Sequence, residues 1–154
     1  MVNVYNVLLS KEDRIPCLVK EAGYKKSSKR NSPKEIVTLL NDVFSMEDLA
    51  EEKSVLVCLR SDGSVSGLFE VSHGTANASF MNSREILLRA LLCGATGIVL
   101  AHNHPSGDPT PSKTDIDTTK QIKDACVLGG INLLDHVIVG ENGNYHSFKE
   151  KGLL

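Results

Sequence analysis

Two histidines and one aspartate, His102, His104 and Asp115, have a spacing that can support metal chemistry. The histidines follow the apolar run 97–101, which predicts a buried strand, and residues two apart in a strand leave the same face. Imidazole and carboxylate groups are zinc ligands, and three protein ligands leave a fourth position for water. The spacing therefore predicts a catalytic Zn²⁺ site formed by these three side chains.

A loop rich in Pro and Gly separates the two histidines from a predicted helix that begins at Lys113. Ser112 is typical of a helix N-cap, and Asp115, in the first turn, can point its carboxylate toward the imidazoles. An alternative is that Ser112 and Asp115 form only a capping box, with Asp in place of the usual Glu. A His-x-His pair on its own is also weak evidence for a metal, whereas the combined spacing is much more specific.

The combined pattern resembles a known metalloprotease motif. His-x-His, seven residues, Ser, two residues and Asp is the order of the JAMM (MPN-plus) family. The surrounding residues resemble its RadC-like branch, from about residue 35 to the C-terminus: Arg84-Glu85, Ala101-His102-Asn103-His104-Pro105-Ser106-Gly107, Pro111-Ser112, Asp115, Asp135-His136 and Ser147-Phe148. The resemblance implies an α/β JAMM sandwich, related to the cytidine-deaminase fold, with helices flanking a mixed central sheet.

The resemblance also implies an activity, the zinc-dependent hydrolysis of a peptide, isopeptide or related amide bond. A glutamate well before the histidines would be the general base, and Ser112 would stabilise the oxyanion. We prefer Glu52 as the base because it stands just before the expected strand 55–59, with a spacing that resembles the Glu opening the corresponding strand in RadC-like sequences. Its charged neighbours are also typical of a solvated surface. Glu70 and Glu85 are the alternatives. A hydroxyl both donates and accepts, so the capping and oxyanion roles of Ser112 are compatible.

Two further histidines have open roles. His73 resembles part of a short RadC-like motif, but a surface or structural role is the more frequent one for such a residue. Asp135-His136 can be an orienting pair or a contact behind a metal ligand, or His136 can be an ordinary sheet histidine.

Composition favours one soluble domain. The chain has 154 residues, of which 41% are hydrophobic and 23% charged, and its formal charge is −2. The four scattered cysteines indicate a reducing compartment, and the N-terminus lacks a signal-peptide pattern, so a cytoplasmic protein without a membrane segment is expected. Neither the substrate nor the oligomeric state is indicated.

We expect two parts, an N-terminal strand and basic loop in 1–31 and, from the resemblance, the RadC-like domain in 32–154. Residues 2–9 are expected to form an edge strand. Hairpins are expected at Asp62-Gly63 and Asn142-Gly143. The helix after Ser112 is expected to bury four residues: Ile116, Ile122, Cys126 and Val127.

Other functions remain open. The basic segment 25–30 is the basis for an alternative, a non-catalytic module that binds DNA or a protein of DNA repair or mobile elements. The helix-hairpin-helix region of longer RadC proteins has no counterpart in residues 1–31, which weakens a DNA role. A nucleobase deaminase is disfavoured because the Pro-Cys-x-x-Cys half of that signature is absent.

Overall fold

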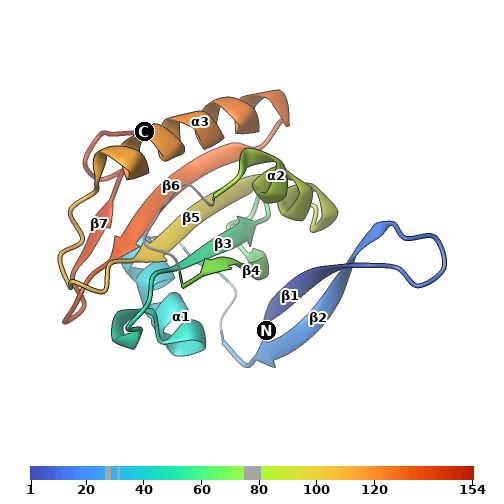
Figure 1. Cartoon of the computed structure of the whole chain (residues 1–154), viewed down its shortest axis with the longest axis horizontal. Coiled ribbons are helices and arrows are strands. Elements are labelled where there is room, and N and C mark those ends of the chain that lie inside the picture. The colour runs from blue at the N-terminus through green and yellow to red at the C-terminus, as the bar shows by residue number, and fades with distance from the viewer. Residues whose placement is uncertain (27–28, 31, 75–80) are drawn as a thin grey trace.

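A mixed seven-stranded sheet forms the centre of the protein (Figure 1). The computed structural model describes residues 1–26, 29–30, 32–74 and 81–154. The strands lie in the order β2-β1-β4-β3-β5-β6-β7. Their bounds are β1 Val2–Leu9, β2 Pro16–Tyr24, β3 Lys53–Leu59, β4 Val65–His73, β5 Gly97–Asn103, β6 Asn132–Val139 and β7 Tyr145–Ser147. The helices are α1 Pro33–Phe44, the 3₁₀ helix η1 Met46–Asp48, α2 Ser83–Leu92 and α3 Lys113–Leu128.

The helices cover both faces of the sheet, α1 on one side and α2 with α3 on the other (Figure 1). Each face has its own hydrophobic core, and the alternation of strand residues assigns side chains to one or the other. In β5, Ile98 and Leu100 pack into the core of α2 and α3, whereas Val99 and Ala101 pack into the core of α1. The predicted α/β sandwich with a mixed sheet is confirmed.

Local sequence signals position the helices, as predicted for the helix that follows Ser112. Ser32 caps α1 and accepts a hydrogen bond from the backbone N–H of Glu35, with Pro33 in the first turn. Asn82 caps α2, and Ser112 caps α3. The β3–β4 hairpin turns at Asp62-Gly63, where Gly63 has a positive φ of 76°.

The prediction that residues 2–9 form an edge strand is wrong. β1 lies inside the sheet, antiparallel to β2 and parallel to β4, and β2 is the edge. The hairpin of β1 and β2 extends away from the helices in Figure 1. The sequence pattern does not predict β2 because Lys20 and Glu21 interrupt its apolar residues.

The predicted inward face of α3 is wrong at two of its four positions. Ile122 and Cys126 are buried, but Ile116 is 42% exposed and Val127 is 73% exposed. The side of α3 that meets the sheet instead includes polar residues, Asp115, Thr118 and Thr119. This polar side of α3 lies over the ends of β5 and β6.

The basic segment 25–30 lies partly outside the described residues. Within the described part, the Lys26 ammonium pairs with the Asp42 carboxylate at 2.8 Å. No described helix is both long enough and apolar enough to cross a bilayer.

Candidate metal centre

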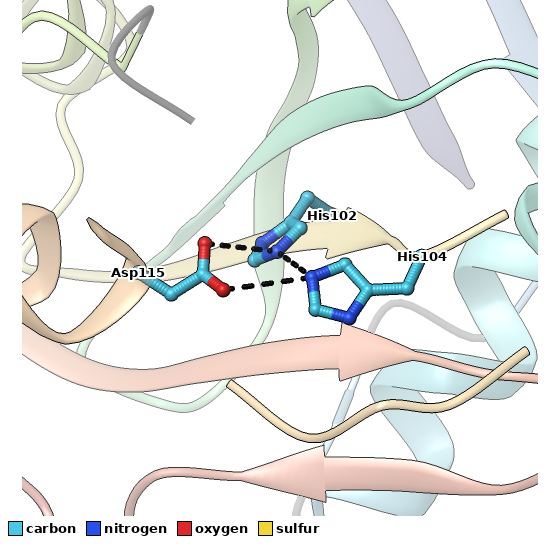
Figure 2. Close-up of side chains that lie close together, drawn as sticks. All are labelled: His102, His104 and Asp115. Carbon is cyan, nitrogen blue, oxygen red and sulfur yellow. Dashed lines mark hydrogen bonds and ion pairs between the residues drawn. The ribbon is translucent and has the colours of Figure 1, made fainter. Parts of the chain in front are cut away.

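His102, His104 and Asp115 converge at the carboxyl end of β5 (Figure 2). The Nε2 atoms of the two histidines are 3.0 Å apart. The Asp115 carboxylate reaches both, with Oδ1 3.3 Å from Nε2 of His102 and Oδ2 3.5 Å from Nε2 of His104. Period-two alternation places both imidazoles on the α3 side of the sheet, and the first turn of α3 supplies the carboxylate, as the sequence predicts.

The donor atoms fit a tetrahedral divalent cation. Bonds of 2.0–2.1 Å in a tetrahedral site imply donor-to-donor separations of about 3.3 Å, and one ligand atom from each of the three side chains lies within 4.8 Å of the other two. His104 is oriented for this role because its Nδ1 lies 2.9 Å from the carbonyl oxygen of Asp108, which can only accept. In the neutral ring the proton therefore resides on Nδ1, and Nε2, which faces the Asp115 carboxylate, is the nitrogen that can bind a metal. These three residues can hold a metal ion.

The electrostatics of the site favour a cation. Burial raises the pKa of the Asp115 carboxyl, but the facing imidazoles of His102 and His104 outweigh burial and hold that pKa well below its usual range. The pKa of His104 is raised, chiefly by its hydrogen bond to Asp115. A protonated His104 would neutralise the carboxylate, and metal binding would displace that proton.

Ser112 forms the predicted capping box with Asp115. Its backbone N–H and its hydroxyl both donate to Asp115 Oδ2 at 2.7 Å, and its hydroxyl accepts from the Asp115 N–H at 3.1 Å. These bonds hold the carboxylate in its rotamer, so the cap also orients the ligand. The hydroxyl proton is engaged by Asp115, and the oxyanion role of Ser112 stays a prediction.

Glu52 lies beside β5, the strand that carries His102, and Asn103 of that strand holds the backbone on both sides of Glu52. The Asn103 amide donates to the carbonyl of Glu51 at 3.1 Å and accepts from the N–H of Lys53 at 2.7 Å. Asn103 is buried and points to the α1 side, opposite to the two imidazoles. The Glu52 carboxylate contributes to the raised pKa of His104, so its charge acts on the site.

The alternative bases are engaged elsewhere. Glu70, on β4, pairs with the Lys53 ammonium at 2.9 Å. Glu85, on α2, pairs with Arg84 and Arg89 at 2.9 Å each, and its hydrogen bond with Arg89 is the main cause of its lowered pKa. Of the three candidates, Glu52 is the one whose charge acts on a candidate ligand, and its role as the base stays a prediction.

The two further histidines considered in the sequence differ in whether they contact the candidate ligands. His73 lies at the exposed end of β4, where it pairs with Glu51 at 3.3 Å and with Glu70 at 3.6 Å. His136 is fully buried, and its Nε2 is 2.9 Å from Nδ1 of His102, so it contacts a candidate ligand directly. Asp135 does not orient the His136 ring, because its carboxylate accepts from the backbone N–H of His136 and from the Ser147 hydroxyl.

Two residues that support the candidate metal site, Asn103 and Thr119, are absent from the sequence-based predictions. Thr119 lies 2.6 Å from Nδ1 of His136 and donates to the Asp115 carbonyl at 2.6 Å. Its position four residues after Asp115 places it on the same side of α3, which is a signal that helical spacing offers. For Asn103, a position between the two candidate ligand histidines is only a weak indication in the sequence that its amide supports the site.

We expect Gly140→Ala to weaken metal binding without touching a ligand. A Cβ at position 140 would lie 2.5 Å from the Gly107 carbonyl oxygen and 2.9 Å from Pro109 Cδ. The loop must move, and with it the Asp108 carbonyl that orients His104. Loss of an orienting partner lowers metal affinity by about 10-fold to 100-fold. Zinc competition with a chromogenic chelator measures the change.

Gly129→Ala is the matched control for that experiment. Gly129 lies at the end of α3, has a φ of −81°, and a Cβ there would meet the Leu87 side chain at 3.1 Å rather than a backbone atom. It should bind zinc as the wild type does. Equal affinity in Gly140→Ala and Gly129→Ala would show that the 107–109 loop does not orient His104.

We expect His136 to make the metal-free protein less stable in acid. Burial is the largest cause that lowers its pKa well below 6.5, and His102 and His104 add to this while Asp115 opposes it. The unfolded chain takes up a proton near pH 6.5 that the folded protein excludes, so stability present above that pH is lost as the pH falls. Between pH 7.5 and 5.5 the loss from this group is at most about 1.4 kcal/mol.

Urea unfolding with a chelator present, at both pH values, measures this difference. His136→Gln should lose less stability than the wild type over the same interval, by up to about 1.4 kcal/mol. Both proteins retain His104, whose raised pKa acts in the opposite sense, so its contribution cancels in the comparison. Parallel losses in the two proteins would contradict a neutral His136.

The fold and site together define a class, α/β sandwich domains with a His-x-His and Asp site that can bind a metal. Residues 30–153 match the sequence profile of the RadC-like JAB domain. The chain therefore belongs to the RadC-like JAB domain family, as the sequence motifs predict.

Curated relatives support the same family. A UPF0758 protein of Clostridium botulinum (strain Okra / Type B1) is 42% identical over 126 residues, which are 82% of this chain and 54% of the relative. A UPF0758 protein of Desulfitobacterium hafniense (strain DSM 10664 / DCB-2) is 42% identical over 124 residues, 80% of this chain and 53% of the relative. The chain spans about half the length of these relatives, and their names state no activity.

Proposed function

We propose that this protein is a zinc-dependent hydrolase of peptide, isopeptide or related amide bonds. The observation that carries the proposal is the convergence of His102, His104 and Asp115 on one point, with the charge of Glu52 acting on the same site. Two imidazoles and a carboxylate suit zinc better than magnesium or calcium, which prefer oxygen ligands.

A bound zinc ion would supply Lewis acidity, which polarises a substrate carbonyl and makes water a usable nucleophile near neutral pH. Glu52 would act as the general base, taking the proton from the attacking water and passing it to the leaving amine. The Asn103 clamp holds the backbone around Glu52 and thereby limits where its carboxylate can lie. His104 is 18% exposed at its side chain, so the site is open to solvent and to a substrate on that side.

Ser112 is at the rim of the site and is the proposed oxyanion donor. Its hydroxyl donates to Asp115, so stabilising an oxyanion requires that proton to turn toward the substrate. The backbone N–H of Ser112 also donates to Asp115 and would keep the carboxylate oriented meanwhile.

The test is metal content followed by hydrolysis of an undirected substrate set. Purified wild type and His104→Ala are dialysed against zinc, and zinc per chain is measured by mass spectrometry. Both are then incubated with a peptide library that includes lysine isopeptide bonds, and new termini are identified. We expect one zinc per chain and cleavage in the wild type alone. A zinc-loaded wild type that cleaves no amide in the library would overturn the proposal.

A further inference from the structure

Three hydrogen bonds connect the candidate ligand His102, on β5, to α3 by way of β6. His102 Nδ1 lies 2.9 Å from His136 Nε2, and His136 Nδ1 lies 2.6 Å from the Thr119 hydroxyl. That hydroxyl lies 2.6 Å from the backbone carbonyl of Asp115. The series begins at one candidate ligand and ends on the backbone of another, and we call it the His102–His136–Thr119 relay.

The chemistry of the groups sets the direction of every bond in the relay. The Asp115 carbonyl can only accept, so the single hydroxyl proton of Thr119 is used there. Thr119 can then only accept from His136, which places a proton on His136 Nδ1. In a neutral imidazole the other nitrogen carries none, so His136 Nε2 accepts, and the proton between the rings belongs to His102 Nδ1. The lone pair of His102 therefore resides on Nε2, the atom that faces His104 and Asp115.

Packing holds the relay in this geometry. His136 is fully buried and stacks on Phe148, with ring centroids 4.9 Å apart and an interplanar angle of 15°. Phe148 is also fully buried, and Thr119 is nearly so. A ring held in this way cannot turn to offer a different nitrogen to His102 without disturbing the core.

We propose that Thr119 and His136 are positioning residues that fix the tautomer of His102, leaving its Nε2 free to bind the metal. The inference rests on the metal centre of the proposed function but not on any reaction there. Partners of this kind usually involve a carboxylate, a carbonyl or water. Here the partner is a neutral imidazole, so the relay orients His102 without adding negative charge behind it.

Removing the Thr119 hydroxyl should move the proton of both His136 and His102 from Nδ1 to Nε2. In Thr119→Val the N–H at His136 Nδ1 has no acceptor in the site, and a buried N–H without a partner is costly. The His136 proton is then better placed on Nε2, donating to His102 Nδ1. His102 must in turn carry its proton on Nε2, where Asp115 Oδ1 lies 3.3 Å away to accept it. That proton occupies the position the metal needs.

The test compares zinc affinity in four proteins by competition with a chromogenic chelator. Thr119→Val should bind zinc about 10-fold to 100-fold more weakly than the wild type, the range for losing such a partner. Thr119→Ser keeps the hydroxyl, and Thr118→Val changes the preceding buried threonine. Both should stay within about threefold of the wild type, because neither removes a hydroxyl from the relay. Wild-type affinity in Thr119→Val overturns the proposal.

A second readout needs neither zinc nor substrate. Long-range ¹H–¹⁵N correlation spectra of the metal-free protein, labelled with ¹⁵N-histidine and recorded at pH 8, report which ring nitrogen carries each proton. We expect Nδ1–H at both His102 and His136 in the wild type and in Thr119→Ser, and Nε2–H at both in Thr119→Val. A wild type with Nε2–H at His136 also overturns the proposal, even if Thr119→Val fails to fold.

The two readouts keep this proposal separate from the proposed hydrolysis. A wild type with the expected tautomers and zinc affinity that cleaves no amide would support the relay and refute the hydrolase. A wild type that cleaves amides, with unchanged zinc affinity in Thr119→Val, would refute the relay alone.

Discussion

Asp115→Asn will abolish stoichiometric zinc binding while leaving the fold intact. The substitution keeps the shape of the side chain and an acceptor oxygen for Ser112, but it removes the negative charge that faces His102 and His104. Replacing a residue that only orients a ligand lowers metal affinity by about 10-fold to 100-fold. Loss of the anionic ligand itself should therefore lower zinc affinity by more than about 100-fold. Zinc per chain after dialysis, with an affinity from chelator competition, measures the effect.

Asp117→Asn is the matched control for that variant. Asp117 lies two residues further along α3 and is exposed, so the same chemical change there removes a charge that faces solvent. It should bind zinc as the wild type does. Retention of one tightly bound zinc in Asp115→Asn would show that the carboxylate is not a ligand, and circular dichroism would show whether either variant is unfolded.

The second large effect is expected at Glu52. Glu52→Gln should retain one zinc per chain but lose about 10²-fold to 10⁴-fold in kcat, the range for a positioned general base, with little change in KM. The glutamine has nearly the same size, and Asn103 contacts only the backbone on either side of it, so the clamp should persist. Rates are measured on a substrate that the library screen identifies.

Three further substitutions make the Glu52 experiment specific. Glu51→Gln changes the adjacent, exposed carboxylate, which pairs with His73, and should leave kcat close to that of the wild type. Glu70→Gln and Glu85→Gln test the alternative bases, whose partners are Lys53 and the two arginines of α2. A fall of the expected size in either of these two, with Glu52→Gln still active, would transfer the role of base to that residue.

The metal-ligand set and the capping of α3 could be predicted from the sequence because they depend on short-range geometry. His102, in β5, and His104, one residue past its end, share a face because alternate residues of an extended chain do, and the His104 N–H continues the pairing with the Val139 carbonyl. Ser112 and Asp115 form a capping box through contacts three residues apart. The α/β class follows in the same way from alternating apolar segments and turn signals such as Asp62-Gly63.

The place of β1 in the sheet and the exposure of α3 depend on which elements meet, and only the tertiary structure decides this. Residues 2–9 have the pattern of a strand, but nothing in it states that a second strand pairs with one side and β4 with the other. Ile116 and Val127 follow an apolar spacing, yet α3 turns its polar side, with Asp115 and Thr119, toward the ends of the strands.

Tertiary contacts also decided which residues hold the candidate ligands and the backbone around Glu52 in place. Asn103 reaches Lys53 across 50 residues of sequence, and His136 reaches His102 across 34. Hydrogen bonds over such separations leave no periodic or local signal, because each partner is an ordinary polar residue within its own element. The sequence by itself therefore determined the residues that can bind a metal, whereas the packing of β3, β5, β6 and α3 determined how those residues are oriented.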